Sequence, residues 1–165
     1  MINQLREAFP QLEVDCLTTI TDKHTFVFEA EKGIFVSDKD KYHLHIENKT
    51  NIEFYFIQND DCLMKTVKGG QCDYVFYNNQ SFCFTEIKVA KGNLANHRKD
   101  AYYQLENTFK YYSKLINFST IENLYALVCF PSSRRIIKAS ASTKRKEFKV
   151  KYRLNLKEGN YFSFE

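Results

Sequence analysis

The chain has 165 residues, of which 44% are hydrophobic and 16% aromatic, and its formal net charge is +4. This composition is typical of a globular protein with a buried core and excludes a disordered chain. No apolar run approaches the ~20 residues that a membrane-spanning helix needs, and the first residues lack the layout of a signal peptide. We therefore predict a single domain over residues 1–165, located in the cytoplasm and without a membrane partner.

The cysteine pattern supports the same compartment. The chain has five cysteines: Cys16, Cys62, Cys72, Cys83 and Cys129. Their spacing fits no zinc motif, and most lie among aliphatic and aromatic residues, where cysteine behaves as a small buried hydrophobe. No Cys–His partnership that would activate a nucleophile is visible. We predict that the cysteines are reduced and structural, as is usual in the cytoplasm.

The first part of the chain predicts one short helix and then several strands. Residues 2–9 carry a weak apolar stripe that ends at Pro10. Alternating patterns and turn residues predict strands at 25–30, 34–37, 42–47 and 52–57. His24, His43 and His45 lie along these segments. We interpret them as ordinary surface or half-buried histidines, with a metal site at His43 and His45 as the weaker alternative.

The stretch from residue 72 to residue 88 predicts two short strands joined by a polar turn at 78–81. Because side chains alternate along a strand, Glu86 and Lys88 share one face. In a hairpin the start of the first strand lies beside the end of the second. Asp73 is therefore expected near Glu86 and Lys88, so that two carboxylates and one ammonium group converge.

The remaining sequence predicts a helix at 97–116, a buried strand at 123–130, a helix at 141–152 and strands at 152–156 and 161–164. The helix at 97–116 lies between two apolar strands, which predicts a crossover that joins parallel strands. We expect an α/β (α+β) fold with a mixed central β-sheet flanked by helices.

Asp73, Glu86, Ile87 and Lys88 resemble the core motif of the PD-(D/E)XK nuclease superfamily. In that family the Asp and Glu hold a divalent metal, the carbonyl of the residue between Glu and Lys often joins them, and the Lys polarises the attacking water. Cys72 stands where the family often has Pro. The resemblance implies a restriction-endonuclease-like core with Mg²⁺ or Mn²⁺ held by Asp73, Glu86 and Ile87.

Two further residues enter through the same resemblance. Gln104, on the helix that follows the Glu-x-Lys strand, matches a glutamine that contacts the metal-bound water or substrate in several branches of the family. Asp60 matches an acidic residue that precedes the motif in small uncharacterised bacterial members, and it is a candidate fourth metal ligand. The alternatives are turn chemistry for Asp60 and a core-boundary amide for Gln104.

Basic residues provide candidate nucleic-acid contacts. Arg98 and Lys99 open the predicted helix at 97–116, where a phosphate would be favourable. Lys144, Arg145 and Lys146 begin a basic cluster in the tail that could follow a phosphate backbone. The alternative for the tail is a solvated helix face.

These features together predict a Mg²⁺-dependent endonuclease that hydrolyses phosphodiester bonds in DNA. By resemblance, it would be an effector in bacterial anti-phage defence that works as a homodimer or with a protein sensor. Two alternatives remain. One is a catalytically silent module that binds nucleic acid or a protein partner. The other is a hydrolase of RNA or nucleotides.

Overall fold

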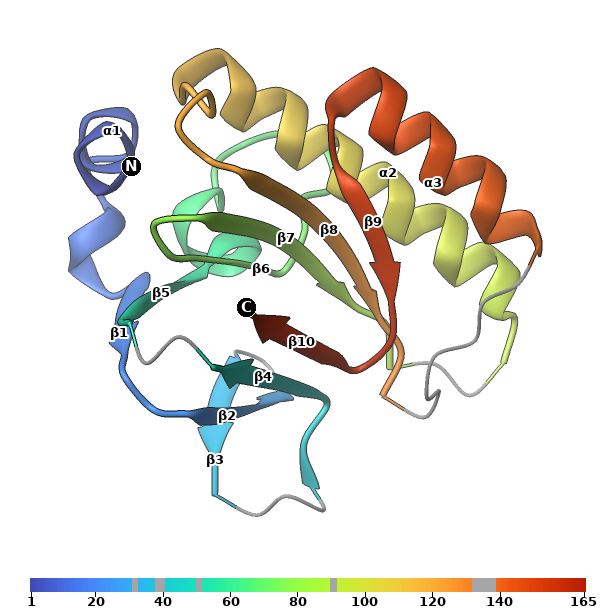
Figure 1. Cartoon of the computed structure of the whole chain (residues 1–165), viewed down its shortest axis with the longest axis horizontal. Coiled ribbons are helices and arrows are strands. Elements are labelled where there is room, and N and C mark those ends of the chain that lie inside the picture. The colour runs from blue at the N-terminus through green and yellow to red at the C-terminus, as the bar shows by residue number, and fades with distance from the viewer. Residues whose placement is uncertain (31–32, 38–40, 50–51, 90–91, 132–138) are drawn as a thin grey trace.

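The computed structural model describes residues 1–30, 33–37, 41–49, 52–89, 92–131 and 139–165. Its layers are a smaller β-sheet, a larger β-sheet and a layer of helices (Figure 1). The larger sheet contains six strands, in the spatial order β1 (Leu17–Ile20), β5 (Phe54–Gln58), β6 (Tyr74–Tyr77), β7 (Ser81–Ile87), β8 (Asn123–Cys129) and β9 (Asn155–Glu158). The smaller sheet contains four, in the order β10 (Tyr161–Phe164), β4 (Leu44–Asn48), β2 (His24–Glu29) and β3 (Gly33–Val36).

The centre of the larger sheet is buried on both faces. All seven residues of β7 are buried, which explains why this segment is rich in aromatic and small residues rather than alternating polar ones. β7 pairs antiparallel with β6 and parallel with β8. Helix α2 (Leu94–Leu115) connects β7 to β8. The predicted crossover between parallel strands is therefore confirmed.

The helices lie on the face of the larger sheet that is turned away from the smaller sheet (Figure 1). They are α1 (Ile2–Ala8), α2, and α3 (Ala139–Tyr152), with a short 3₁₀ turn, η1 (Leu12–Val14), after α1. Phe84 and Leu105 belong to the core under the helices. Phe76 and Phe162 belong to the core between the two sheets. The large aromatic content thus fills two separate hydrophobic layers.

The prediction of a mixed α/β fold is confirmed, although the chain builds two mixed sheets where we expected one. The two tail strands belong to different sheets: β9 pairs parallel with β8, and β10 pairs parallel with β4. Strand β1 was not predicted from the sequence. No helix in the described part of the chain is both long and apolar enough to cross a membrane.

The prediction that all cysteines are reduced is wrong for Cys16 and Cys62, which form a disulfide. Their pairing follows from the fold, because Cys16 precedes β1 while Cys62 belongs to a π-helical turn, η3 (Asn59–Leu63), that follows β5, and β1 pairs with β5. Cys72, Cys83 and Cys129 are buried free thiols, as predicted. Cytoplasmic location stays a prediction.

Candidate active site

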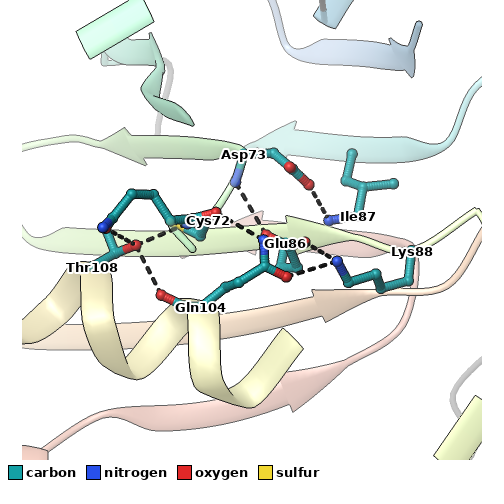
Figure 2. Close-up of polar contacts among 8 residues, drawn as sticks. Cys72, Asp73, Glu86, Ile87, Lys88, Gln104 and Thr108 are labelled. Carbon is teal, nitrogen blue, oxygen red and sulfur yellow. Dashed lines mark hydrogen bonds and ion pairs between the residues drawn. The ribbon is translucent and has the colours of Figure 1, made fainter. Parts of the chain in front are cut away.

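Asp73 and Glu86 meet at one end of the β6–β7 hairpin (Figure 2). Tyr74 pairs with Thr85 in the strand register, so Asp73 lies opposite Glu86 just beyond the end of β6. The Asp73 backbone N–H donates to Glu86 Oε2 at 3.2 Å, and the Ile87 N–H donates to Asp73 Oδ2 at 2.6 Å. The structure therefore brings these two carboxylates together, as the hairpin argument expected.

Lys88 joins them from the same face of β7. Its ammonium nitrogen Nζ lies 2.5 Å from Glu86 Oε1 and donates to Gln104 Oε1 at 2.7 Å (Figure 2). Gln104 reaches this point from α2, which packs on β7. All four predicted catalytic residues thus form one connected group, in which Asp73 is joined to Glu86 through its backbone N–H.

The carboxylate pair, Asp73 and Glu86, carries more negative charge than its surroundings balance. Glu86 is only 1% exposed, and burial raises its pKa although the adjacent Lys88 ammonium opposes the rise. Burial also raises the pKa of Asp73, and the charge of Glu86 adds to that rise. Of the two carboxyls, Lys88 pairs directly with that of Glu86 alone, while its charge acts only weakly on the half-buried Asp73, so the site favours an additional proton or cation.

A buried network fixes the position of Gln104. The Gln104 side-chain amide donates to the Gln71 carbonyl oxygen at 3.0 Å. The Thr108 hydroxyl accepts the Cys72 N–H at 2.8 Å and donates to Gln71 Oε1 at 3.1 Å. Because the segment before Asp73 is tied to α2 in this way, the same contacts orient both Gln104 and the start of β6.

The η3 turn places Asp60 next to the carboxylate pair. The backbone N–H groups of Asn59 and Asp60 donate to the Asp73 carbonyl oxygen at 2.8 and 3.4 Å. The Asn59 side chain is itself held by Tyr112, whose hydroxyl donates to Asn59 Oδ1 at 2.8 Å. Burial raises the pKa of Asp60, and the neighbouring charge of Asp61 raises it further. Asp60 is therefore another acid for which a cation would be favourable.

Glu29 is an acidic residue near the site that the sequence analysis missed. It lies at the end of β2, accepts a hydrogen bond from the Tyr74 hydroxyl, and lines a small pocket together with Asp60, Asp61 and Asp73. Burial is the main reason why its pKa is raised. No local motif marks Glu29, because only the packing of the smaller sheet against the larger one brings it here.

The donor atoms suit a hard cation, although they are not yet arranged around one. In the part of the chain that the structure describes, no three acidic, histidine or cysteine side chains meet in a geometry that would hold a metal. Glu86 is paired with Lys88, and Asp73 accepts the Ile87 N–H. Carboxylate and carbonyl oxygens are nevertheless the ligands that Mg²⁺ prefers. Asp73, Glu86 and the Ile87 carbonyl fit such an ion in chemical type.

Arg98 does not belong to the exposed basic surface that we predicted. It is only 9% exposed, and its Nε donates to both carboxylate oxygens of Glu158 at 3.1 Å. Its guanidinium carbon also lies 5.4 Å from the centre of the Phe130 ring. The sequence placed Arg98 at the helix start but could not show that β9 brings a buried carboxylate to it.

The other predicted nucleic-acid contacts differ in exposure. Lys99 and Lys146 are exposed. Lys144 pairs with Glu147 one turn along α3 at 2.7 Å, and Arg145 is half-buried. Lys99 and Lys146 are therefore the fully exposed cations of the predicted set.

Comparison with known proteins finds no relative of this chain: no family model, curated protein or solved structure matches it. The candidate site must therefore be interpreted from its own geometry and chemistry.

Proposed function

We propose that the protein is a metal-dependent endonuclease of the PD-(D/E)XK type that hydrolyses phosphodiester bonds in DNA. One observation carries the proposal. Glu86, which is buried, and Asp73, which is half-buried, meet at the end of a hairpin, and Lys88 contacts both Glu86 and a glutamine from the following helix. Three charged residues on an exposed surface would be screened by water, and burial would not raise the pKa values of their carboxyl groups.

The chemistry of the residues matches the reaction. A bound Mg²⁺ would neutralise charge on a scissile phosphate and make its bound water more acidic. Asp73 and Glu86 can supply carboxylate oxygens to the ion, and the Ile87 carbonyl can supply a third. Lys88 can donate hydrogen bonds to a water or phosphate oxygen, while Gln104 accepts a hydrogen bond from the Lys88 ammonium group and keeps that group oriented.

DNA is the proposed substrate because the helices carry exposed cations. Lys99 lies in the second turn of α2 and Lys146 on α3, and both are exposed. Contacts of this kind act on the phosphate backbone without reading sequence, so binding should weaken as salt rises. A role as an anti-phage effector, acting as a homodimer or with a protein sensor, rests on the resemblance of the motif.

The test is cleavage of a panel of supercoiled, linear and single-stranded DNA and of RNA, in Mg²⁺, in Mn²⁺ and in EDTA. Glu86→Gln and Lys88→Ala should each lower cleavage by about 10²-fold or more, since the first removes a carboxylate that would hold the ion and the second a donor to the water or phosphate. Glu122→Gln is the matched control, because Glu122 is an exposed glutamate outside the site.

Cleavage by wild type that persists in Glu86→Gln would contradict the assignment of the site. Cleavage of RNA but not DNA would change the substrate. DNA binding without cleavage in any metal would favour the silent binding module, in which the Lys88–Glu86 ion pair is simply structural. Calorimetric titration of Mg²⁺ and Mn²⁺ into wild type and Asp73→Asn tests ion binding separately from cleavage.

A further inference from the structure

Two histidines meet on the face of the smaller sheet that is turned away from the larger sheet. His24 on β2 pairs in register with Glu47 on β4, and Phe26 pairs with His45. The intervening residues Thr25 and Ile46 are buried, and Ile46 belongs to the core between the sheets, so His24, His45 and Glu47 project from the opposite face. The sequence suggested His43 and His45 as neighbours, but the nearest imidazole to His45 comes from the adjacent strand.

The two imidazoles are separated by a distance typical of ligands that share a metal ion. His24 Nδ1 lies 3.2 Å from His45 Nε2. Zinc binds histidine nitrogens at ~2.0–2.1 Å in a tetrahedral arrangement, which places two such nitrogens about 3.3 Å apart. The same distance also allows a hydrogen bond in which one ring nitrogen donates to the other. Little movement would therefore be needed to replace the shared hydrogen with a metal ion.

Aromatic rings hold one of the two ligands in place. The His45 ring stacks on Phe26 with centroids 4.5 Å apart, and Tyr161 packs edge-on against it at 5.2 Å. Such contacts restrict the orientation of the ring before any ligand binds, which lowers the entropic cost of binding. His24 is exposed, so an ion could reach the pair from solvent.

Glu47 adds a negative charge beside the pair. Its carboxylate accepts a hydrogen bond from the Tyr161 hydroxyl, and this contact is the main cause that lowers its pKa. The two histidines act on it in the same direction. Glu47 also pairs with Lys49 at 3.9 Å and is an ionised group on the same strand face, where it would favour a cation between the imidazoles.

We propose that His24 and His45 form a two-histidine binding site for Zn²⁺ or a similar borderline transition-metal ion. Neutral imidazole is a preferred ligand for zinc, nickel and copper and a poor one for Mg²⁺. Because the described residues include no cluster of three protein ligands, water would complete the coordination. The ion would be exchangeable, and the site is distinct from the carboxylate pair and does not depend on the proposed nuclease activity.

The experiment titrates ZnCl₂, and separately NiCl₂, into untagged protein near pH 7.5 without reducing agent, so that the Cys16–Cys62 disulfide stays intact. Calorimetry gives the stoichiometry, and NMR follows the imidazole proton signals. We expect the histidine pair to bind one Zn²⁺ per chain, and His24→Ala to lower the affinity for that ion by about tenfold or more. His97→Ala is the matched control, because His97 lies on α2 outside this pair.

Wild type that binds no Zn²⁺, or His24→Ala that binds it as tightly as wild type, would overturn the proposal. His24 is exposed, and unchanged circular dichroism and melting temperature would show that its replacement leaves the fold intact. Asp73→Asn should bind Zn²⁺ like wild type. If Zn²⁺ binding is instead lost in Asp73→Asn and kept in His24→Ala, the ion binds at the carboxylate pair and the two-histidine site is refuted.

Discussion

Two groups of acids with limited exposure lie on helix α2 or are linked to its side chains, and they differ in how their charge is balanced. The first is the carboxylate pair, Asp73 and Glu86. The second comprises Glu106 and Glu158, which we call the helix-interface acids. The Glu158 carboxylate accepts hydrogen bonds from Arg98 Nε and from the Tyr102 hydroxyl. Glu106 accepts the Tyr152 hydroxyl and pairs with Lys110 at 2.6 Å and Lys151 at 3.5 Å.

As a result, the pKa of Glu106 and the pKa values of the carboxylate pair move in opposite directions. Burial opposes the ionisation of Glu106, but Lys110, Tyr152 and the charge of Lys151 outweigh it and lower its pKa to about 2. At the carboxylate pair, Lys88 and the backbone N–H groups of Ile87 and Asp73 oppose burial but do not outweigh it, and both pKa values rise. The helix-interface acids are therefore structural, whereas full ionisation of the carboxylate pair is unfavourable and a metal ion would offset the charge.

The largest loss of stability is expected when a helix-interface acid loses its cation. Arg98→Ala should lower the free energy of unfolding by about 3–5 kcal/mol, because it leaves the Glu158 carboxylate buried without its cation. Urea denaturation measures the change. Lys99→Ala is the matched control, because Lys99 is the next residue in the chain and its side chain is exposed. Its effect on the free energy of unfolding should stay within about 0.5 kcal/mol. Equal effects in both variants would contradict the structural role of Arg98.

A disulfide bond holds the turn beside the carboxylate pair, which distinguishes this pair from the helix-interface acids. The Cys16–Cys62 disulfide closes a loop with a sequence separation of 46 residues and holds the η3 turn, whose N–H groups contact the Asp73 carbonyl. In the chain-entropy model, its loss should cost about 2–4 kcal/mol. Denaturation of wild type and of Cys16→Ser with Cys62→Ser, with and without reductant, measures this.

Hydrogen exchange locates the same effect. Loss of the disulfide should accelerate exchange at the Asn59 and Asp60 amides more than at amides in the middle of α2. Uniform acceleration over both regions would show that the disulfide stabilises the fold as a whole and has no particular effect on the turn beside the carboxylate pair.

The sequence predicted the helices and strands better than it predicted which of them contact one another. The hairpin before α2 could be predicted because its signals are local: two aromatic runs, a polar turn and a Glu-x-Lys ending. Register then fixed the meeting of Asp73 with Glu86. Gln104 was found through helical spacing and resemblance, and the structure does connect it to Lys88.

Contacts between distant segments could not be predicted in this way. Glu29, the Arg98–Glu158 ion pair and the His24–His45 pair all join residues from separate elements. Each depends on which strand lies beside which, and no local pattern encodes that order. Gly33 illustrates the point: a Cβ there would lie 2.4 Å from the Tyr74 hydroxyl oxygen, a steric requirement that is visible only once β3 lies against the larger sheet.

The pH dependence of stability in Glu106→Gln tests whether the charge of this helix-interface acid stabilises the fold. A folded pKa of about 2, below the usual value, means that the charged group contributes stability above about pH 4.5 and loses it as pH falls toward 2. The variant should therefore be less stable than wild type by about 1–2 kcal/mol at pH 7, after allowance for partial exposure, and nearly equal near pH 2. Denaturation at both pH values checks this, and a pH-independent difference would refute the electrostatic explanation.

Asp73→Asn should have a smaller effect of the opposite sign. The folded pKa of Asp73 is raised, so wild type loses stability as pH rises from about 4 through the raised value. The asparagine carbonyl can still accept the Ile87 N–H but carries no charge. Without metal, the variant should be more stable by about 1 kcal/mol at pH 8, and the difference should vanish near pH 4.

Mg²⁺ should reverse this order, because an ion that binds only the folded state stabilises it. At ten times the dissociation constant, wild type should gain about 1.4 kcal/mol, whereas Asp73→Asn should gain much less. Thermal denaturation at pH 8 with and without Mg²⁺ measures both effects. A variant that is less stable than wild type in the absence of metal would show that the carboxylate pair is already balanced. The contrast with the helix-interface acids, and with it the argument for a cation site, would then fail.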